Sequence, residues 1–480
     1  MKNRKRFYKI LFLSCLFCFI SCKEAPKKQN FVFILVDDLG WTDLGYSGST
    51  FYETPNIDAF SKQSINFTNA YASASICSPS RASILTGKHP ARINITDWLP
   101  GDNPQNRKLI GAKDLDQLPL SEATLPEILK QNGYQTFFAG KWHLGDKGYL
   151  PTDFGFETNL GGYHKGQPPA GYYSPYKNPY LKDGKKGEYL TDRLTQESIN
   201  FLDTIHQKPF FLMLSYYTVH TPIQANTMYV NQFREKLKNL DSLKVFDKKE
   251  GSAMTKMVQN NPKYASMLFA LDKNVGDLIA KLKAKGLYSN TTIIFTSDNG
   301  GLSTLEPQYS FKAPTSTLPL RGGKGWLYEG GIRVPLLIKP ANFSSTEKVN
   351  ETPVIGHDFF STILAQANIK VDENNKIDGV DLSEILINDG KIDRQELFWH
   401  YPHYHGSGWT PGAAIRQGNW KLIEFYETKT VELYNLENDI SEQNNLAKQH
   451  PEKVKALTKK LHYLQKNANA NSVTINTNKE

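Results

Sequence analysis

The chain has 480 residues, 39% of them hydrophobic, which is enough for one large domain with a substantial core and a smaller domain beside it. Its formal charge of +9 would suit a polyanionic partner, but that charge falls to +4 without the five basic residues of the first nine positions, which are Lys2, Arg4, Lys5, Arg6 and Lys9. The remaining charge gives no reason to expect a nucleic-acid-binding protein.

The first residues have the pattern of an export signal. A basic start is followed by an apolar run at 11–20, then Ser21 and Cys22, and then a polar segment. The apolar run is too short to span a bilayer, so we interpret residues 1–21 as a cleaved signal peptide. Residues 19–22 resemble a bacterial lipobox, which implies a lipid on Cys22 and anchoring to the bacterial cell envelope, in the periplasm or on the outer-membrane surface. A plain secretory signal is the alternative.

Cysteine usage isolates a single thiol. Cys15 and Cys18 leave with the signal peptide and Cys22 would carry lipid, so Cys77 is the thiol that remains in the folded domain. No internal disulfide can then form. A lone thiol in an exported protein calls for a chemical explanation.

The first predicted strand ends at two carboxylates. Residues 31–36 are a continuous apolar run of β-forming residues, which is typical of a buried parallel strand. Asp37 and Asp38 follow directly. By themselves, these two residues are equally consistent with a solvated strand end.

Residues 75–90 predict a short helix directly after Cys77. Ser78, which precedes a proline, is the predicted capping residue, and Gly87 is the predicted end. Arg81 would lie about one turn from Cys77, and the helix N-terminus would present backbone N–H groups to an anion. The stretch predicts an anion site that contains a reactive sulfur, although a buried cysteine beside a surface helix would show the same spacing.

Three further apolar runs, at 136–139, 210–216 and 291–296, also end in polar clusters. Helical patterns alternate with them, notably at 125–132 and 264–285. The predicted fold class is therefore α/β, with a mostly parallel central sheet flanked by helices. Ligands bind beyond the carboxyl ends of strands in such sheets, so we expect the clusters to converge on one crevice. With Asp37-Asp38 there are four such clusters, the others being Gly140-Lys-Trp-His143, His220-Thr-Pro222 and Ser297-Asp-Asn-Gly300.

Two segments depart from this pattern. Residues 161–188 are rich in Gly, Pro, Tyr and Lys without periodicity, which predicts a long functional loop. Short strands at 413–426 and 431–436 and an amphipathic helix at 451–465 predict a small C-terminal antiparallel α+β subdomain, with a frayed tail after Asn467. We therefore divide the chain into the signal peptide 1–21, the main α/β domain 22–395 and the C-terminal subdomain 396–480.

The polar clusters favour a hard cation beside an anion. Four of their side chains offer only oxygen donors, a set that suits Ca²⁺ better than Mg²⁺, and no histidine or thiolate spacing indicates zinc. These four are Asp37, Asp38, Asp298 and Asn299. Three carboxylates around a dication leave about one net negative charge, which Arg81, Lys141 and Lys324 more than offset. The site should then attract an anion, although each lysine taken singly is better explained as a solvated side chain.

The pattern Cys77-Ser-Pro-Ser-Arg81, followed by Thr86-Gly87, resembles the signature of formylglycine-dependent sulfatases. In that family the cysteine is oxidised to an aldehyde, 3-oxoalanine, by a maturating enzyme. The resemblance extends from about residue 30 to about residue 446 and implies an alkaline-phosphatase-like fold and one Ca²⁺ per chain. The implied metal ligands are Asp37, Asp38, Cys77, Asp298 and Asn299. The implied catalytic residues are Cys77, Arg81, Lys141, His143, His220 and Lys324.

The resemblance also implies a mechanism. One hydroxyl of the hydrated aldehyde, made more acidic by the metal, attacks sulfur in line. His220 would protonate the departing sugar oxygen, and His143 would lie nearer the formylglycine. Loss of a proton from the second hydroxyl then lets the diol collapse to the aldehyde and expel sulfate.

We therefore predict an exported sulfatase that acts on a sulfated carbohydrate such as ulvan, an algal galactan or a glycosaminoglycan. Loop aromatics would stack on the sugar, namely Trp98, Tyr163, Tyr172, Tyr173, Tyr176, Trp399, Tyr401, Tyr404 and Trp409. Three histidines could contact its substituents or belong to a surface loop, namely His400, His403 and His405. Two alternatives stay open: a phosphonate or phosphodiester hydrolase of the same superfamily, and a non-catalytic glycan-binding lipoprotein with an unmodified Cys77.

Overall fold

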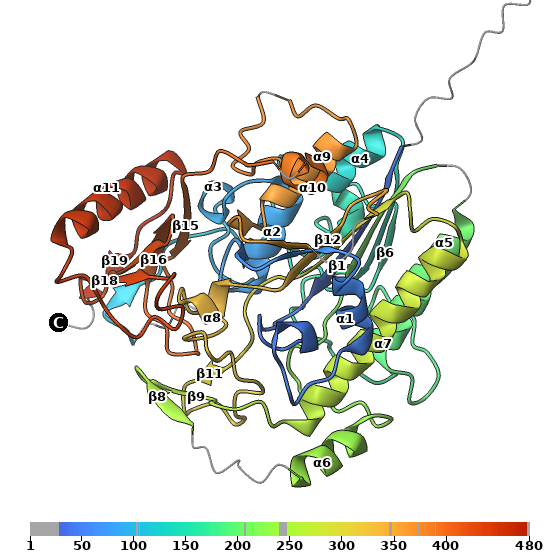
Figure 1. Cartoon of the computed structure of the whole chain (residues 1–480), viewed down its shortest axis with the longest axis horizontal. Coiled ribbons are helices and arrows are strands. Elements are labelled where there is room, and N and C mark those ends of the chain that lie inside the picture. Colours follow the sequence, from blue (N-terminus) through green and yellow to red (C-terminus); the bar gives the residue numbers. More distant parts are fainter. Residues whose placement is uncertain are drawn as a thin grey trace, which may run out of the picture.

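Figure 1 shows the computed structural model of the chain. It describes residues 28–101, 104, 106–205, 208–239, 247–344, 348–372, 374–388 and 390–477. The predicted signal peptide and Cys22 lie outside these residues. Within the described ranges, every helix is too short or too polar to cross a bilayer.

An eight-stranded sheet forms the centre of the main domain, in the order β13-β2-β12-β10-β1-β7-β5-β6. Among the described strands of this sheet, only β12 runs against its neighbours, so the predicted mostly parallel sheet is confirmed. The strands are β1 (Asn30–Val36), β2 (Ile65–Phe67), β5 (Gln135–Gly140), β6 (Thr158–Leu160), β7 (Phe210–Ser215), β10 (Thr291–Ser297), β12 (Leu336–Lys339) and β13 (Lys348–Asn350).

Helices cover both faces of this sheet, which is why its central strands are apolar throughout. In β1, Val32, Ile34 and Val36 pack into one core and the alternate residues 31, 33 and 35 pack into another. Figure 1 shows α1 (Pro55–Ser61), α5 (Leu190–Thr204) and α7 (Pro262–Ala284) on one side of the sheet. The other side carries α2 (Cys77–Thr86), α4 (Leu125–Gln131), α9 (Asp358–Gln366) and α10 (Ser383–Asn388).

The C-terminal part is a four-stranded antiparallel sheet, as predicted. Its strands are β15 (Glu396–Tyr401), β16 (Gly412–Gln417), β17 (Trp420–Phe425) and β18 (Thr430–Asn435). One face packs on α11 (Pro451–Asn467) through a small apolar core that includes Leu422 and Leu461. The other face packs on the main domain, where Trp399 meets Tyr71 and Trp326 in a third core.

The predicted frayed tail is wrong. Ala468 is buried, and β19 (Thr474–Ile475) pairs antiparallel with β4 (Leu109–Ile110) of the main domain. Asn476 adds a hydrogen bond from its Nδ2 to the Arg107 carbonyl at 2.9 Å. Pairing with a distant strand orders a segment whose own sequence is polar.

Buried charges join the C-terminal sheet to the main domain. Lys421 of β17 places its Nζ 2.9 Å from Glu329 Oε1 and 2.8 Å from Glu442 Oε1. Glu329 begins α8 (Glu329–Ile332) and also accepts a 2.7 Å hydrogen bond from Arg333 Nε. Glu329, Lys421 and Glu442 are fully buried, so each charge depends on its partners for stabilisation.

The remaining elements are short. Residues 161–188 contain no helix or strand beyond isolated bridges, which confirms the predicted loop. The short elements are η1 (Gly45–Ser47), β3 (Ala70–Tyr71), α3 (Pro90–Ile93), η2 (Pro151–Phe154), α6 (Val230–Lys238), β8 (Lys248–Glu250), β9 (Ala253–Thr255), β11 (Thr304–Leu305) and β14 (Val354–Ile355).

Candidate active site

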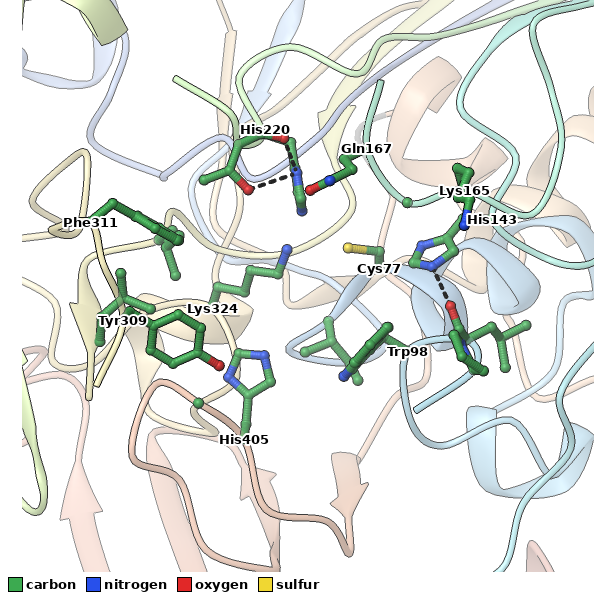
Figure 2. Close-up of a pocket in the computed structure, with 18 of the residues that line it drawn as sticks. Cys77, Trp98, His143, Lys165, Gln167, His220, Tyr309, Phe311, Lys324 and His405 are labelled. Carbon is green, nitrogen blue, oxygen red and sulfur yellow. Dashed lines mark hydrogen bonds between the residues drawn. The ribbon is translucent and has the colours of Figure 1, made fainter. Parts of the chain in front are cut away.

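A cavity of about 540 Å³ opens where the polar clusters meet, beyond the carboxyl ends of β1, β5, β7 and β10. Four of the residues predicted to act in the site line this cavity: Cys77, His143, His220 and Lys324. Figure 2 shows the Cys77 sulfur and the tip of Lys324 in the middle of it. The remaining predicted residues lie beneath them and contact one another, so the predicted convergence on one crevice is observed.

Cys77 is the first residue of α2, so the helix begins two residues before Pro79, the first helical residue that a cap at Ser78 predicts. Ser78 does not cap the helix, because its hydroxyl bridges two other segments: Oγ donates to the His143 carbonyl at 2.9 Å and accepts from the Leu99 N–H at 3.1 Å. Gly87 ends the helix in the left-handed region, as predicted. Cys77 is buried, and this burial raises the pKa of its thiol to about 11 even though two lysines oppose the shift.

The carboxylates of two neighbouring strands meet directly. Val36 and Ser297 are paired in the register of β1 and β10, so the residues that follow them lie side by side. The Asp38 N–H donates to Asp298 Oδ1 at 3.2 Å, and Asn299 Nδ2 donates to Asp38 Oδ1 at 2.8 Å. Asp37, Asp38, Asp298 and Asn299 are all buried. Three carboxylates are thus held together away from water.

Each of these carboxylates has a cation beside it. Lys141 Nζ lies 2.8 Å from Asp37 Oδ2, and Lys324 Nζ lies 2.8 Å from Asp38 Oδ1. Arg81 Nη2 lies 2.7 Å from Asp298 Oδ2. Arg81 Nη1 also donates to the Lys141 carbonyl at 2.7 Å and to Ser215 Oγ at 2.6 Å. Arg81 therefore links α2 to the ends of β5, β7 and β10.

The buried carboxylates and their neighbouring cations shift one another's pKa values. Burial, reinforced by repulsion from Asp298 and Asp38, raises the pKa of Asp37 to about 8 against the opposing charge of Lys141. Burial also disfavours the charge on Asp38, but Lys324 and His220 hold the pKa of that carboxyl below its usual range. A cluster with this much internal repulsion would be stabilised by a further positive charge.

The donors present fit a divalent cation. Asn299 Oδ1 is buried and has no hydrogen-bond partner among the described residues, as expected of an oxygen reserved for a ligand. Donor atoms of Asp37, Asp38, Cys77 and His220 all lie within 4.8 Å of one another. Oxygen atoms dominate the combined set, so a hard cation such as Ca²⁺ suits it. His220 was not among the predicted ligands; its Nε2 lies 3.7 Å from Asp38 Oδ2.

The two histidines present different nitrogens to the cavity. His143 Nε2 lies 2.8 Å from the Leu99 carbonyl, which assigns its proton to Nε2 and leaves the buried Nδ1 without a partner in the described structure. Burial keeps the pKa of His143 well below its usual value. His220 Nδ1 lies 2.8 Å from the Thr221 carbonyl, so Nδ1 carries the proton. Burial, reinforced by Lys324, lowers the pKa of His220 to about 3.

The prediction that nine aromatic side chains stack on the sugar is wrong for most of them. Trp98 and Tyr404 line the cavity, and Tyr173 does not. The other six are buried: Trp399 and Tyr401 belong to β15, and four lie in loops that fold inward, namely Tyr163, Tyr172, Tyr176 and Trp409.

The three predicted histidines divide in the same way. His405 lines the cavity. His400 and His403 are buried, with Nε2 of each 2.8 Å from the Asn471 carbonyl and from Thr96 Oγ1 respectively.

Sequence reasoning missed part of the cavity rim. Tyr309 and Phe311 stand on one wall and Lys165 and Gln167 on another (Figure 2). The aperiodic composition of 161–188 marked the loop that carries Lys165 and Gln167. Nothing in the sequence marked the segment that carries the two aromatic residues.

Comparison with known proteins gives one consistent result. A family model described as sulfatase matches residues 29–369, and one described as N-sulphoglucosamine sulphohydrolase, C-terminal, matches residues 323–468. The chain is 29% identical over 504 residues to a Formosa agariphila protein named sulfatase, covering 89% of this chain and 86% of that protein. It is 29% identical over 499 residues to arylsulfatase J of Mus musculus, covering 92% of this chain and 77% of that protein. The crystal structure of Ps i-CgsB in complex with k-i-k-neocarrahexaose is similar with a TM-score of 0.74 and 29% identity, over 91% of this chain and 93% of that one.

Proposed function

Since this chain belongs to the sulfatase family, whose members hydrolyse sulfuric esters, we propose that it removes sulfate from a sulfated carbohydrate through a formylglycine at position 77. The observation that carries the proposal is the placement of Cys77 in the cavity, directly above a buried cluster of carboxylates and cations. Its Sγ lies 3.7 Å from Asp37 Oδ1, and Lys324 reaches the same cavity. An anionic ester that entered would meet the positive side chains at the base.

The proposed nucleophile is a hydroxyl of the hydrated aldehyde at position 77. This hydroxyl gives up its proton and a new sulfur–oxygen bond forms to it as the bond from sulfur to the sugar oxygen breaks; the sugar oxygen takes up a proton, so the step neither gains nor loses one. The second hydroxyl then loses its proton, the bond from carbon to the sulfated oxygen breaks, and the aldehyde is restored as sulfate leaves. His143 Nδ1, which is unprotonated, is placed to accept that proton.

The other residues hold the ester and balance its charge. Lys141 and Lys324 offset the negative charge of the carboxylates at the bottom of the cavity, and Arg81 fixes the carboxylate of Asp298. A calcium ion held by Asp37, Asp38, Asp298 and Asn299 would supply Lewis acidity at this position. We assign the acid role to His220. With its ring neutral and its proton on Nδ1, that role requires protonation of Nε2 once the anionic ester is bound.

The proposed substrates are sulfated oligosaccharides or polysaccharides, of the algal type such as ulvan or a galactan, or glycosaminoglycans. The similarity to a structure solved with a neocarrahexaose supports a saccharide ligand. We further propose that the protein is exported, that a lipid on Cys22 anchors it to the bacterial cell envelope, and that a separate maturating enzyme, with its own oxidant, converts Cys77.

Mass spectrometry of the peptide that contains Cys77 tests the proposal, on protein made with a maturating enzyme. We expect the mass of formylglycine, turnover of defined sulfated oligosaccharides, and faster hydrolysis of aryl sulfates than of aryl phosphates. Cys77→Ala should abolish turnover while the circular dichroism spectrum and Tm stay those of the parent. Active protein that retains a free thiol, or turnover by Cys77→Ala, would contradict the nucleophile. Preference for phosphate esters would favour the related phosphonate or phosphodiester chemistry.

A further inference from the structure

The rim of the cavity carries two walls of different chemistry. Tyr309 and Phe311 form one wall, and Lys165 lies on the opposite side beside His143 (Figure 2). The Cys77 sulfur lies between these walls. A sugar that presented its ester to position 77 would therefore have one wall on each side.

The aromatic wall is exposed and held in place. Tyr309 and Phe311 are 41% and 42% exposed, and their ring centroids are 5.8 Å apart at an interplanar angle of 71°. The Tyr309 hydroxyl packs so closely on Gly406 that a Cβ there would overlap it. Exposed rings fixed at the mouth of a polar cavity provide an apolar surface for the CH face of a sugar.

The opposite wall carries a charge without a partner. Lys324 is already paired with Asp38, and His164 lies 2.8 Å from Asp146 through Nδ1. No carboxylate in the described part of the chain forms an ion pair with Lys165, and no Asp or Glu lines the cavity. Lys165 is therefore an exposed positive charge at the rim without an ion-pair partner among the described residues.

The loop that carries Lys165 is fixed against the catalytic centre. The neighbouring Gly166 packs on the His143 ring, so that a Cβ on Gly166 would lie 2.5 Å from His143 Cε1. Any larger residue would push the loop away from the ring. The contact keeps Lys165 beside the cavity instead of letting it move freely with a surface loop.

From these observations we propose that Lys165 binds a second anionic group of the substrate, a sulfate or a carboxylate, on the saccharide that stacks against Tyr309 and Phe311. The scissile sulfate has its own cations at the base of the cavity, so Lys165 serves a different group. The site then selects saccharides with at least two negative charges over singly sulfated ones. This inference rests on the function proposed above.

Inhibition of 4-nitrophenyl sulfate hydrolysis by matched disaccharides tests it. Three galactose disaccharides are compared, with one sulfate, two sulfates, or one sulfate and one carboxylate, and Ki is measured for the enzyme matured at Cys77. We expect tighter binding of the doubly charged sugars. Lys165→Gln should reduce the preference over the singly sulfated sugar about 3- to 10-fold, and Lys165→Arg should retain most of it. The doubly charged sugar whose Ki rises more in Lys165→Gln identifies the second group as sulfate or carboxylate.

Two matched controls come from the chain itself. Lys182→Gln changes an exposed lysine of the same loop that does not line the cavity, and should leave the ratio of Ki values unchanged. Phe311→Ala should weaken the binding of all three sugars, raising each Ki about 3- to 10-fold. Tyr463→Ala, which changes an exposed ring of α11, should leave the Ki values unchanged.

An unchanged ratio in Lys165→Gln, or an equal change in Lys182→Gln, would overturn the inference while leaving the sulfatase function intact. No hydrolysis of any sulfate ester by protein with formylglycine at position 77 would instead overturn the proposed function, and the inference with it.

Discussion

Replacing Lys421 with methionine should destabilise the protein strongly. Lys421 is fully buried and is 2.8–2.9 Å from the carboxylates of Glu329 and Glu442. Without it, Glu329 keeps the 2.7 Å contact with Arg333, but the Glu442 carboxylate keeps, among the described residues, only the hydrogen bond from the Glu329 N–H. Breaking a buried ion pair by removing one partner costs about 3–5 kcal/mol, because an uncompensated charge is left inside the protein. We expect the free energy of unfolding to fall by about that amount.

Urea denaturation followed by tryptophan fluorescence at pH 7.5 measures this loss. Lys429→Met is the control, because Lys429 is exposed on the following turn and should cost less than about 0.5 kcal/mol. The double variant Lys421→Met with Glu442→Gln should recover part of the loss, since it removes the stranded carboxylate. If Lys421→Met cost no more than Lys429→Met, the buried ion pairs would not be what holds the C-terminal sheet to α8.

Three further outcomes are expected. His220→Ala should slow the hydrolysis of sugar sulfates about 10²- to 10⁴-fold and that of activated aryl sulfates much less, because a good leaving group needs no acid, and equal losses would remove His220 from that role. Chelation with EDTA should lower the Tm, and Ca²⁺ should restore it more fully than Mg²⁺ because the ligands mix carboxylate and amide oxygens; an unchanged Tm would argue against a resident cation. Burial lowers the pKa of His400 to about 4, against 6.5 in the unfolded chain. Burying the neutral ring therefore contributes its full share to the free energy of unfolding above pH 6.5, and this contribution is lost as the pH falls toward 4. At pH 5 the loss is about 2 kcal/mol, and denaturation of His400→Gln should depend less steeply on pH between 7 and 5; the same slope in both proteins would refute this.

The parts of the structure that follow from local pattern were predictable. Asp37 and Asp298 were expected to meet because each follows an apolar strand, and parallel strands end at one edge of a sheet. Lys141 and His143 follow β5 in the same way. The sequence does not contain the register that pairs Val36 with Ser297, but any register of neighbouring parallel strands would have brought these clusters near each other.

The parts decided by distant contacts were not predictable. Ser78 has the sequence of a helix cap, but its hydroxyl is engaged by His143 and Leu99, which lie far away in the chain. Tyr172 lies in a loop rich in polar residues and is nonetheless buried, because its hydroxyl donates to the Tyr217 carbonyl at 2.6 Å. Exposed Phe311 has no periodic neighbours that would distinguish it from such a buried ring.

The base and the rim of the cavity are built differently, and this separates chemistry from selectivity. The base depends on strand ends and buried charges, where one substitution disturbs several partners at once. Tyr309, Phe311 and Lys165 instead project from connecting segments, at the rim and outside the buried carboxylate cluster. Gene duplication followed by changes in those segments could therefore redirect the enzyme to a new sulfated saccharide without rebuilding the machinery below.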